Sequence, residues 1–445
     1  MPGITPDAQE QPSHRRFSRR DFLLTAAAAA GTTVVTGCAT TSRTQTSPII
    51  WPAGRSAERL RVGLIGCGGR GTGAAKDCVT SSPNVQIVAL GDLFRDRLDG
   101  CLKNLTEAEL GEKIDVTPDR CFTGFDNYLG VLACDLDMVI LATPPGFRPP
   151  HLKAAIEAGK HVFMEKPVCV DPIGARSVIA TSELAAQKGL AIVCGTQRRH
   201  QPSYLETMKR IHDGDIGEIV GAQCYWNQGD LWVKKREPGW SDMEWQCRNW
   251  LYFCWLSGDH IVEQHVHNVD VVNWAMHGPP VKAVGMGGRQ VRTAPEYGDI
   301  FDHFSVEYEY ENGARVLSMC RQVKGASHRV SERLVGTKGT SNPDGVIEGK
   351  RAFKFEPVGE AVNPYVQEHA DLIASIRLGK PLNEGRRIAE STLTAVMGRM
   401  SAYTGREISW KWLMNASELD LTPPKYEFGD LPVGPVPIPG VTKLI

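Results

Sequence analysis

Residues 59–71 read Arg59-Leu60-Arg61-Val62-Gly63-Leu64-Ile65-Gly66-Cys67-Gly68-Gly69-Arg70-Gly71. The apolar run that ends at Ile65 predicts a buried parallel strand, and the G-x-G-x-x-G after it predicts a turn into a helix. The first glycine permits the tight turn, the second lets the backbone approach a pyrophosphate, and the third lets the helix pack against the strand. The free amides at the start of that helix would then face the phosphates of a dinucleotide. The predicted cofactor-binding residues in this segment are Gly66, Gly68, Gly69, Arg70 and Gly71.

A carboxylate follows this motif at the spacing that a dinucleotide site needs. The apolar run at residues 85–90 predicts a second strand, which ends in Gly91-Asp92, and Asp92 comes 21 residues after Gly71. A carboxylate there accepts hydrogen bonds from the adenosine ribose and repels a 2′-phosphate, which favours NAD over NADP. Arg95 and Arg97 lie close by, so NADP stays open as an alternative cofactor. The alternative for Asp92 is a helix N-cap.

Three further apolar strands continue the alternation of strands and helices. They are expected at residues 137–143, 161–164 and 191–194, with helices at 151–159 and near 171–188 between them. This alternation predicts a doubly wound parallel sheet, and so an α/β Rossmann domain at residues 59–195. Pro144-Pro145 ends the first of these strands at the carboxyl edge of the sheet, where a ligand would lie. Thr143 and Pro144 are therefore candidate cofactor contacts.

The pattern changes after about residue 217. Long strands with alternating polarity are expected at residues 219–226, 301–310 and 314–323, and Asn312-Gly313 predicts a hairpin turn between the last two. Residues 196–415 are expected to form an α+β domain with an open, mostly antiparallel sheet that binds substrate and forms an oligomer interface. Residues 416–445 would be a C-terminal tail. Two cores fit a chain of 445 residues, because single cores stop growing at roughly 250–300 residues.

The first 38 residues are interpreted as an export signal and residues 39–58 as a linker. Ser18-Arg19-Arg20-Asp21-Phe22-Leu23-Leu24 resembles a twin-arginine signal. The alanine-rich run after it is too short for a membrane span of about 20 residues. Val35-Thr36-Gly37-Cys38 resembles a lipobox, which makes Cys38 a candidate lipid anchor; the alternative is ordinary cleavage nearby. Export to the periplasm or cell envelope is therefore expected.

Charge and cysteine placement narrow the class of protein. The formal net charge is −1, so no basic field is expected to hold nucleic acid. The twelve cysteines are scattered, mostly in apolar runs, and none forms a C-x-x-C pair. They are expected mainly as small buried side chains, with room for a bridge or two.

Gly159-Lys160-His161-Val162-Phe163-Met164-Glu165-Lys166-Pro167 resembles the signature of the Gfo/Idh/MocA family, the group of glucose–fructose oxidoreductase and inositol dehydrogenase. The likeness spans about residues 59–410, with agreement in order at residues 66–71, Asp92, 142–144, 195–199 and 371–381. Residues 145–150 depart from it by a slight expansion. The resemblance implies that Lys166 is an active-site lysine and that Glu165 lies beside it at the cofactor; the alternative is a surface ion pair between the two. A cis bond before Pro167 fits that turn.

A group of polar residues follows in the second half. Residues 258–276 are expected to form one helix, on which His260, Glu263, His267 and Asp270 share a face. Residues 263–270 are similar to the family's Asp-x-x-x-His-x-x-Asp pattern, which implies that His267 is the catalytic histidine, with Glu263 in the usual place of Asp. Two alternatives stay open: a metal site made by His260, Glu263 and His267, and a purely structural polar cluster.

The tryptophans are unevenly placed. Six of the ten lie between Trp226 and Trp255, interleaved with polar residues that include Arg248 and Asn249. Flat apolar rings beside polar groups suit the C–H faces and hydroxyls of sugars, whereas the alternative is a packed core or an oligomer interface. The predicted substrate-binding residues are Gln197, Arg198, Arg248, Asn249 and His260.

These patterns together predict an NAD-dependent oxidoreductase that needs no metal. Hydride would pass between NAD and a secondary alcohol or ketone of a sugar, polyol or glycoside. His267 would be the general base, Lys166 would position the same oxygen, and Glu263 and Asp270 would orient the histidine or bind neighbouring hydroxyls. We expect a homo-oligomer, either a dimer or a tetramer. The alternatives are a redox-neutral NAD-dependent glycosidase or lyase and a non-catalytic nucleotide- or sugar-binding protein.

Overall fold

The computed structural model describes residues 59–445. The predicted twin-arginine pair, Cys38 and the linker at residues 39–58 lie outside the described residues. Between residues 59 and 445, no helix combines the length and the apolar composition that crossing a membrane requires.

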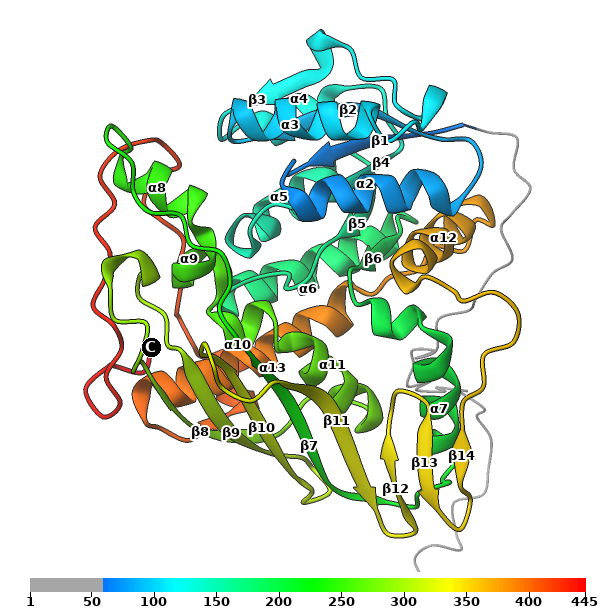
Figure 1. The fold of residues 1–445 in the computed structure, drawn as a ribbon, viewed down its shortest axis with the longest axis vertical. Coiled ribbons are helices and arrows are strands. Elements are labelled where there is room, and N and C mark those ends of the chain that lie inside the picture. The colour runs from blue at the N-terminus through cyan, green and yellow to red at the C-terminus, as the bar shows by residue number, and fades with distance from the viewer. Residues whose placement is uncertain (1–58) are drawn as a thin grey trace, which may run out of the picture. The chain divides into compact units, whose positions relative to one another are not determined.

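The first part of the chain folds around a six-stranded parallel sheet, as the alternation of strands and helices predicts (Figure 1). Its strand order is β3-β2-β1-β4-β5-β6, and β1, β2, β4, β5 and β6 are buried almost throughout because helices cover both faces. The strands are β1 (Leu60–Ile65), β2 (Val85–Asp92), β3 (Cys121–Thr123), β4 (Met138–Leu141), β5 (His161–Met164) and β6 (Ile192–Cys194). The helices are α2 (Gly69–Ser81), α3 (Arg95–Thr106), α4 (Asn127–Ala133), α5 (Arg148–Glu157) and α6 (Pro172–Gln187).

Two elements of this domain differ from the sequence expectation. The short strand β3 is an addition, because its three residues carry no apolar run. Helix α5 begins at Arg148 rather than at His151. Pro149 and Pro150 fit its first turn, where backbone N–H groups have no partner in the helix. The expanded segment is thus a 3-10 turn, η3 (Pro145–Phe147), that leads directly into the helix.

The second part folds around a nine-stranded sheet with the order β14-β13-β12-β11-β7-β10-β9-β8-β15. All neighbours are antiparallel except β7 and β10, so the prediction of a mostly antiparallel sheet is confirmed. The predicted turn at Asn312-Gly313 joins β9 to β10, with Gly313 at φ +83°. The strands are β7 (Ile219–Gln228), β8 (Lys282–Gly288), β9 (His303–Glu309), β10 (Arg315–Gln322), β11 (Arg329–Gly336), β12 (Gly339–Asn342), β13 (Val346–Gly349), β14 (Phe353–Lys354) and β15 (Ile408–Ser409).

Helices fill the space between the two sheets. Helix α13 packs against β8 and β9 on one side and against α6 on the other, while α11 packs against β7 and β11 (Figure 1). Helix α12 lies within the predicted second domain but packs on α2 and β6 of the first. The helices are α7 (Pro202–His212), α8 (Asp242–Arg248), α9 (Cys254–Ser257), α10 (His260–Glu263), α11 (Val266–Ala275), α12 (Pro364–Arg377), α13 (Gly385–Thr404) and α14 (Trp410–Asn415).

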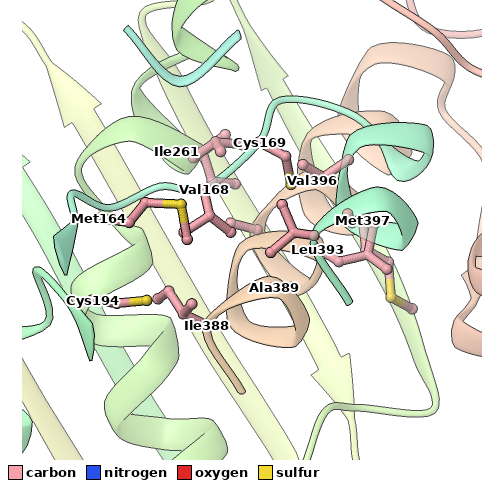
Figure 2. Packing of buried hydrophobic residues seen from close by; sticks show 14 of the residues in the cluster. Met164, Val168, Cys169, Cys194, Ile261, Ile388, Ala389, Leu393, Val396 and Met397 are labelled. Atoms are coloured by element: carbon pink, nitrogen blue, oxygen red, sulfur yellow. The ribbon is translucent and has the colours of Figure 1, made fainter. Parts of the chain in front are cut away.

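One apolar core runs from the first sheet into these helices. Cys194 at the end of β6 packs beside Ile388 of α13, and Met164 at the end of β5 belongs to the same cluster as Leu393 of that helix (Figure 2). The cysteines of residues 59–445 are all free thiols, and most are buried, as their apolar sequence context predicts. Because the core is continuous, the first sheet holds the helices of the second half in place.

Candidate active site

A cavity of about 620 Å3 opens at the carboxyl ends of the parallel strands. Gly66 follows β1, Thr143 follows β4 and Glu165 follows β5, and all three line it. The order of the sheet reverses between β1 and β4, and the crevice at such a point is where open α/β sheets bind ligands. From there the cavity reaches Glu263 and His267 of the second half. One cavity therefore joins the nucleotide motif to the residues predicted to act on substrate.

The glycine motif has the geometry that a dinucleotide requires. Gly66 has φ +99°, and a side chain there would meet the backbone of Ala142 at 2.6 Å. A Cβ on Gly71 would lie 1.9 Å from the carbonyl oxygen of Gly66, so only glycine lets α2 approach the turn. At Gly68 and Gly69 a Cβ would meet nothing within 4 Å, so the backbone there faces open space at the start of α2. This space fits a pyrophosphate held by the helix N-terminus.

Asp92 lines the cavity at the end of β2. One carboxylate oxygen accepts from the amide of Cys67 at 2.6 Å, and the other accepts from the amide of Phe94 at 2.9 Å. Burial raises the pKa of Asp92, while these two hydrogen bonds oppose that shift. Phe94, not Asp92, is the N-cap residue of α3. Asp92 is therefore tied to the glycine turn rather than serving as the predicted alternative of a helix cap.

Arg70 and Glu165 form an ion pair inside the cavity, with 2.5 Å between Nε and Oε1. Arg70 also lies 3.4 Å from both Asp77 and Glu368. Glu165 is 5% exposed, so the alternative of a surface ion pair between Glu165 and Lys166 is wrong.

Lys166, Glu263 and His267 converge in the same cavity. Nζ of Lys166 donates to Oε1 of Glu263 at 3.1 Å and to the carbonyl oxygen of Glu263 at 2.5 Å. The bond between Lys166 and Pro167 is cis, as that turn suggests. The ring of His267 stacks on Trp226 with 5.6 Å between centroids. Burial and the nearby charge of Lys166 hold the pKa of His267 well below its usual value, so its imidazole is neutral and able to accept a proton.

The expected single helix at residues 258–276 is wrong, because it is divided into α10 and α11. Asp259, at φ +73°, accepts from the amides of His260 and Phe301 and from the hydroxyl of Tyr403. These contacts fix the chain direction just before α10, and the helix breaks again at Gln264. The common face of His260, Glu263, His267 and Asp270 therefore does not exist.

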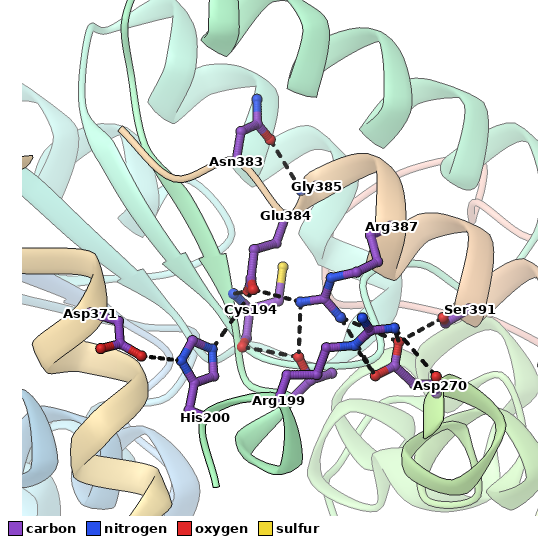
Figure 3. Close-up of polar contacts among 11 residues, drawn as sticks. Cys194, Arg199, His200, Asp270, Asp371, Asn383, Glu384, Gly385, Arg387 and Ser391 are labelled. Atoms are coloured by element: carbon purple, nitrogen blue, oxygen red, sulfur yellow. Dashed lines mark hydrogen bonds and ion pairs between the residues drawn. The ribbon is translucent and has the colours of Figure 1, made fainter. Parts of the chain in front are cut away.

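Asp270 points into a buried network with Arg199 and Ser391 (Figure 3). Its carboxylate accepts from Nε of Arg199 at 2.7 Å and from the hydroxyl of Ser391 at 2.7 Å, and it lies 3.3 Å from Arg387. Burial alone would raise the pKa of Asp270, but the two arginines lower it. The prediction that Asp270 orients the catalytic histidine is corrected: it neutralises the buried Arg199 instead.

The network continues through His200, which lies between Asp371 and Glu384 (Figure 3). Nδ1 of His200 is 2.6 Å from Asp371, and Nε2 is 3.8 Å from Glu384. Burial would lower the pKa of His200, but the hydrogen bond to Asp371 and the negative charge of Glu384 raise it to about 10. His200 is therefore a buried cation that joins α12 to the start of α13.

The predicted substrate residues divide into two groups. Gln197 and Arg248 line the cavity. Arg198 instead pairs with Glu332, and Asn249 accepts from the amide of Lys234 at 2.8 Å and donates to the carbonyl oxygen of Glu296 at 2.7 Å. His260 lies 2.9 Å from Asp259 and packs on Phe304, outside the cavity. The last three do not line the cavity, and each binds another residue of the protein.

His260 therefore does not join Glu263 and His267, as the alternative of a shared metal site would require. Within residues 59–445, no three potential ligands lie close enough to hold an ion together.

Several cavity residues were missed from the sequence. Arg148 is buried, and burial lowers its pKa to about 10. It donates to the carbonyl oxygen of Pro167, so it supports the turn that carries Lys166. The uneven placement of tryptophan did signal Trp232 and Trp250, which line the cavity. Arg148 had no such signal, since a lone arginine in a proline-rich loop is usually exposed.

Comparisons with known proteins agree with this geometry. Residues 60–196 match the model of an oxidoreductase family with an NAD-binding Rossmann fold, and residues 204–342 match the GFO/IDH/MocA C-terminal domain. The NAD(+)-dependent scyllo-inositol 2-dehydrogenase of Bacillus subtilis (strain 168) is 24% identical over 63% of this chain and 73% of that protein. An inositol 2-dehydrogenase of Rubrobacter xylanophilus is 23% identical over 64% of this chain and 71% of that protein.

Solved structures share the fold. The scyllo-inositol dehydrogenase of Lactobacillus casei, with bound NAD(H) and scyllo-inositol, superimposes with a TM-score of 0.60 at 18% identity. The match covers 79% of this chain and 99% of that one.

Proposed function

The chain belongs to the Gfo/Idh/MocA family of oxidoreductases, and from this premise we propose that it oxidises a secondary alcohol of a polyol or sugar with NAD as its preferred cofactor. It is a dehydrogenase of the inositol dehydrogenase kind, which acts on CH–OH groups. The observation that carries the mechanism is the convergence of Lys166, Glu263 and His267 in the cavity that also holds the glycine motif. An alcohol bound there would lie between a neutral base and a cation.

The proposed chemistry assigns a task to each of these side chains. Bound nicotinamide supplies the acceptor for the hydride that leaves the carbinol carbon. His267 takes the proton of the same hydroxyl, because burial keeps its imidazole neutral. Lys166 donates a hydrogen bond to the alcohol oxygen and stabilises the negative charge that develops on it. The proton therefore ends on His267 and the oxygen becomes the carbonyl of the product.

Glu263 acts on Lys166 in this proposal. Its carboxylate and its own carbonyl oxygen both accept from Nζ, so the ammonium is held from two directions. Two acceptors leave one of its three N–H donors free for substrate. The longer carboxylate in the usual place of Asp is thus compatible with a positioned lysine.

Asp92 supports the preference for NAD. Its carboxylate lies in the cavity at the end of β2, where it would accept from the ribose hydroxyls and repel a 2′-phosphate. Arg97 also lines the cavity and is the residue that would tolerate NADP. The preference between NAD and NADP is measurable as the ratio of their dissociation constants.

Two features support a polyol or sugar as substrate. The relatives named above are inositol dehydrogenases. Trp232 and Trp250 also line the cavity, with 6.3 Å between their ring centroids. Flat rings of this kind cover the C–H faces of cyclic polyols and sugars, while Lys234 and Gln197 offer polar contacts.

The test is a panel of inositols, aldoses and glycosides with NAD, in which NADH is followed by absorbance. The proposed function predicts net NADH formation with at least one polyol or sugar. A redox-neutral glycosidase is the second candidate, because a glycosyl hydrolase family 109 protein of Saccharopolyspora erythraea is 27% identical over 49% of this chain and 48% of that protein. Release of an aglycone without net NADH would select that candidate.

Export and assembly belong to the same proposal. The sequence from Ser18 to Leu24, with Arg19 and Arg20, supports transport by the twin-arginine route, and Cys38 is the proposed lipid anchor. We also propose a homo-oligomer. Fractionation of the host cell and the mass of the mature N-terminus test export and lipidation, and sedimentation of the purified protein tests assembly.

A further inference from the structure

Three phenylalanines form one wall of the cavity. Phe94 follows β2, Phe125 follows β3, and Phe147 lies in the turn η3 after β4. Phe94 and Phe125 stand at the carboxyl ends of neighbouring strands, with Phe94 two residues after Asp92, and the ring of Phe147 lies 6.4 Å from that of Phe125. Because Asp92 is placed to meet the adenosine ribose, this aromatic wall borders the adenosine end of the cavity.

A segment from the other end of the chain packs on these rings. The ring of Phe428 lies 6.0 Å from Phe94 and 5.1 Å from Phe125, measured between centroids. The ring of Tyr426 lies 6.1 Å from Phe125 and 5.5 Å from Phe147. Phe428 is 49% exposed and Tyr426 is 36% exposed. Both rings therefore touch the wall on one side and water on the other.

Helix α8 closes the same end from a second direction. Cys247 and Arg248 line the cavity directly. The guanidinium of Arg248 lies 3.8 Å from the ring centre of Phe94 and forms an ion pair with Asp96 of α3 at 3.2 Å. This helix belongs to the second half of the chain but covers the first.

The C-terminal segment ties α8 in place. The amide of Met243 donates to the carbonyl oxygen of Gly429 at 3.2 Å, and Nε2 of Gln246 donates to the carbonyl oxygen of Leu431 at 2.6 Å. The amide of Leu431 donates to the carboxylate of Asp242 at 3.1 Å. Residues 426–431 and α8 thus form one hydrogen-bonded unit, which we call the clasp.

We propose that the clasp controls cofactor exchange: it closes the adenosine end of the cavity, and the nucleotide leaves only when residues 426–431 detach from the aromatic wall. This inference rests on the proposed function, in which the cavity binds NAD. Because the rings are already half-exposed, detachment exposes little additional apolar surface, and its free-energy cost is therefore small. Nucleotide retention is therefore set in part by residues 426–431, none of which lines the cavity.

The experiment measures how fast NADH leaves the full-length protein. NADH is bound, an excess of NAD is added, and the loss of energy transfer from tryptophan to NADH gives the dissociation rate. The combined change Tyr426→Ala and Phe428→Ala should raise this rate about tenfold, because an aromatic contact contributes roughly 0.5–1.5 kcal/mol and 1.4 kcal/mol is a factor of ten. Phe428→Leu keeps apolar bulk and should give an intermediate rate.

Val441→Ala is the matched control, since Val441 is a 72% exposed residue of the same tail beyond the clasp. It should leave the rate unchanged. Unliganded melting temperatures of the clasp variants should fall by at most a few degrees, as the lost contacts predict, which separates a clasp from general destabilisation. Equal dissociation rates in the clasp variants and the unsubstituted protein would overturn the clasp alone. Failure of the unsubstituted protein to bind NADH would overturn the proposed function and the clasp with it.

Discussion

Nζ of Lys166 lies 2.5 Å from the carbonyl oxygen of Glu263 and 3.1 Å from its carboxylate. The lysine follows the fifth strand of the first sheet, and the glutamate is the last residue of α10 in the second half. An ion pair between the two halves of the chain therefore lies in the same cavity as the proposed general base, His267.

His267→Ala should lower turnover by about 10²–10⁴-fold, the usual contribution of a positioned base. NADH binding should stay close to normal, because the nucleotide is held by the glycine motif in the other domain. His303→Ala is a suitable control, since its side chain is 45% exposed on β9. Steady-state kinetics and an NADH titration measure both quantities. Near-normal turnover of His267→Ala would remove the assignment.

The rate should be nearly independent of pH down to well below pH 6.5. A general base works in its unprotonated form, so activity falls as the pH drops through the pKa of His267. Burial first, and then the charges of Lys166, Arg198 and Arg70, hold that pKa well below its usual value. Lys166→Met removes one of these charges and should move the acid limb to higher pH. A profile of kcat/KM from pH 4 to 8 checks this, and an unmoved limb would contradict the electrostatic argument.

Asp92→Ala should narrow the ratio of NADP to NAD dissociation constants, because the side chain no longer repels a 2′-phosphate. Asp92→Asn is the informative companion, since it removes the charge but keeps one oxygen that accepts from either the amide of Cys67 or that of Phe94. Both variants should therefore weaken the discrimination between NAD and NADP, and Asp92→Asn should preserve the stability of the fold better than Asp92→Ala. Tighter binding of NADP than NAD by the unsubstituted protein would refute the role of Asp92.

Asp270→Asn should destabilise the fold by about 3–5 kcal/mol, because it leaves buried arginines without their counter-charge. The matched control is Asp135→Asn, which removes an ion pair with Arg61 from a side chain that is 83% exposed. That change should leave the stability close to that of the unsubstituted protein, because solvent screens an exposed ion pair. Urea unfolding of the two variants gives the comparison. If the Asp270→Asn protein were stable and had lost only turnover, the prediction that Asp270 serves catalysis would stand instead.

The stability contributed by His200 should be lost in alkaline solution. Its folded pKa of about 10 lies above the ordinary value of 6.5. The contribution is therefore complete below pH 6.5 and declines as the pH rises through about 10. His200→Gln should remove this dependence, so the melting temperatures of the two proteins should converge between pH 6.5 and 10. Parallel curves over that range would show that His200 is neutral in the fold.

The first domain could be predicted because its information is local. Each buried strand is a continuous apolar run, and the glycine turn and Asp92 are fixed by spacing along one β-α-β unit. Strand β3 escaped notice because it is short and half-buried.

The site in the second half was only partly predictable, since contacts distant in sequence determine it. The predicted helix at residues 258–276 begins only at His260, after Asp259 binds Phe301 and Tyr403, and it is interrupted after Glu263. Helical periodicity predicted that Asp270 lies beside His267. It could not show that Arg199 and Arg387 bind the carboxylate of Asp270 instead. Arg148 and the aromatic wall likewise acquire their meaning only when separate strand ends meet.

Phe94 and Phe428 are in contact in the folded protein, but the ribosome synthesises Phe428 long after Phe94. At roughly 5–20 residues per second, the interval between them is on the order of half a minute. During that interval the nascent first domain can already fold around its glycine turn, with the outer side of Phe94 uncovered. Because translation proceeds from the N-terminus, dinucleotide can bind in the cavity before residues 426–431 are made and close it.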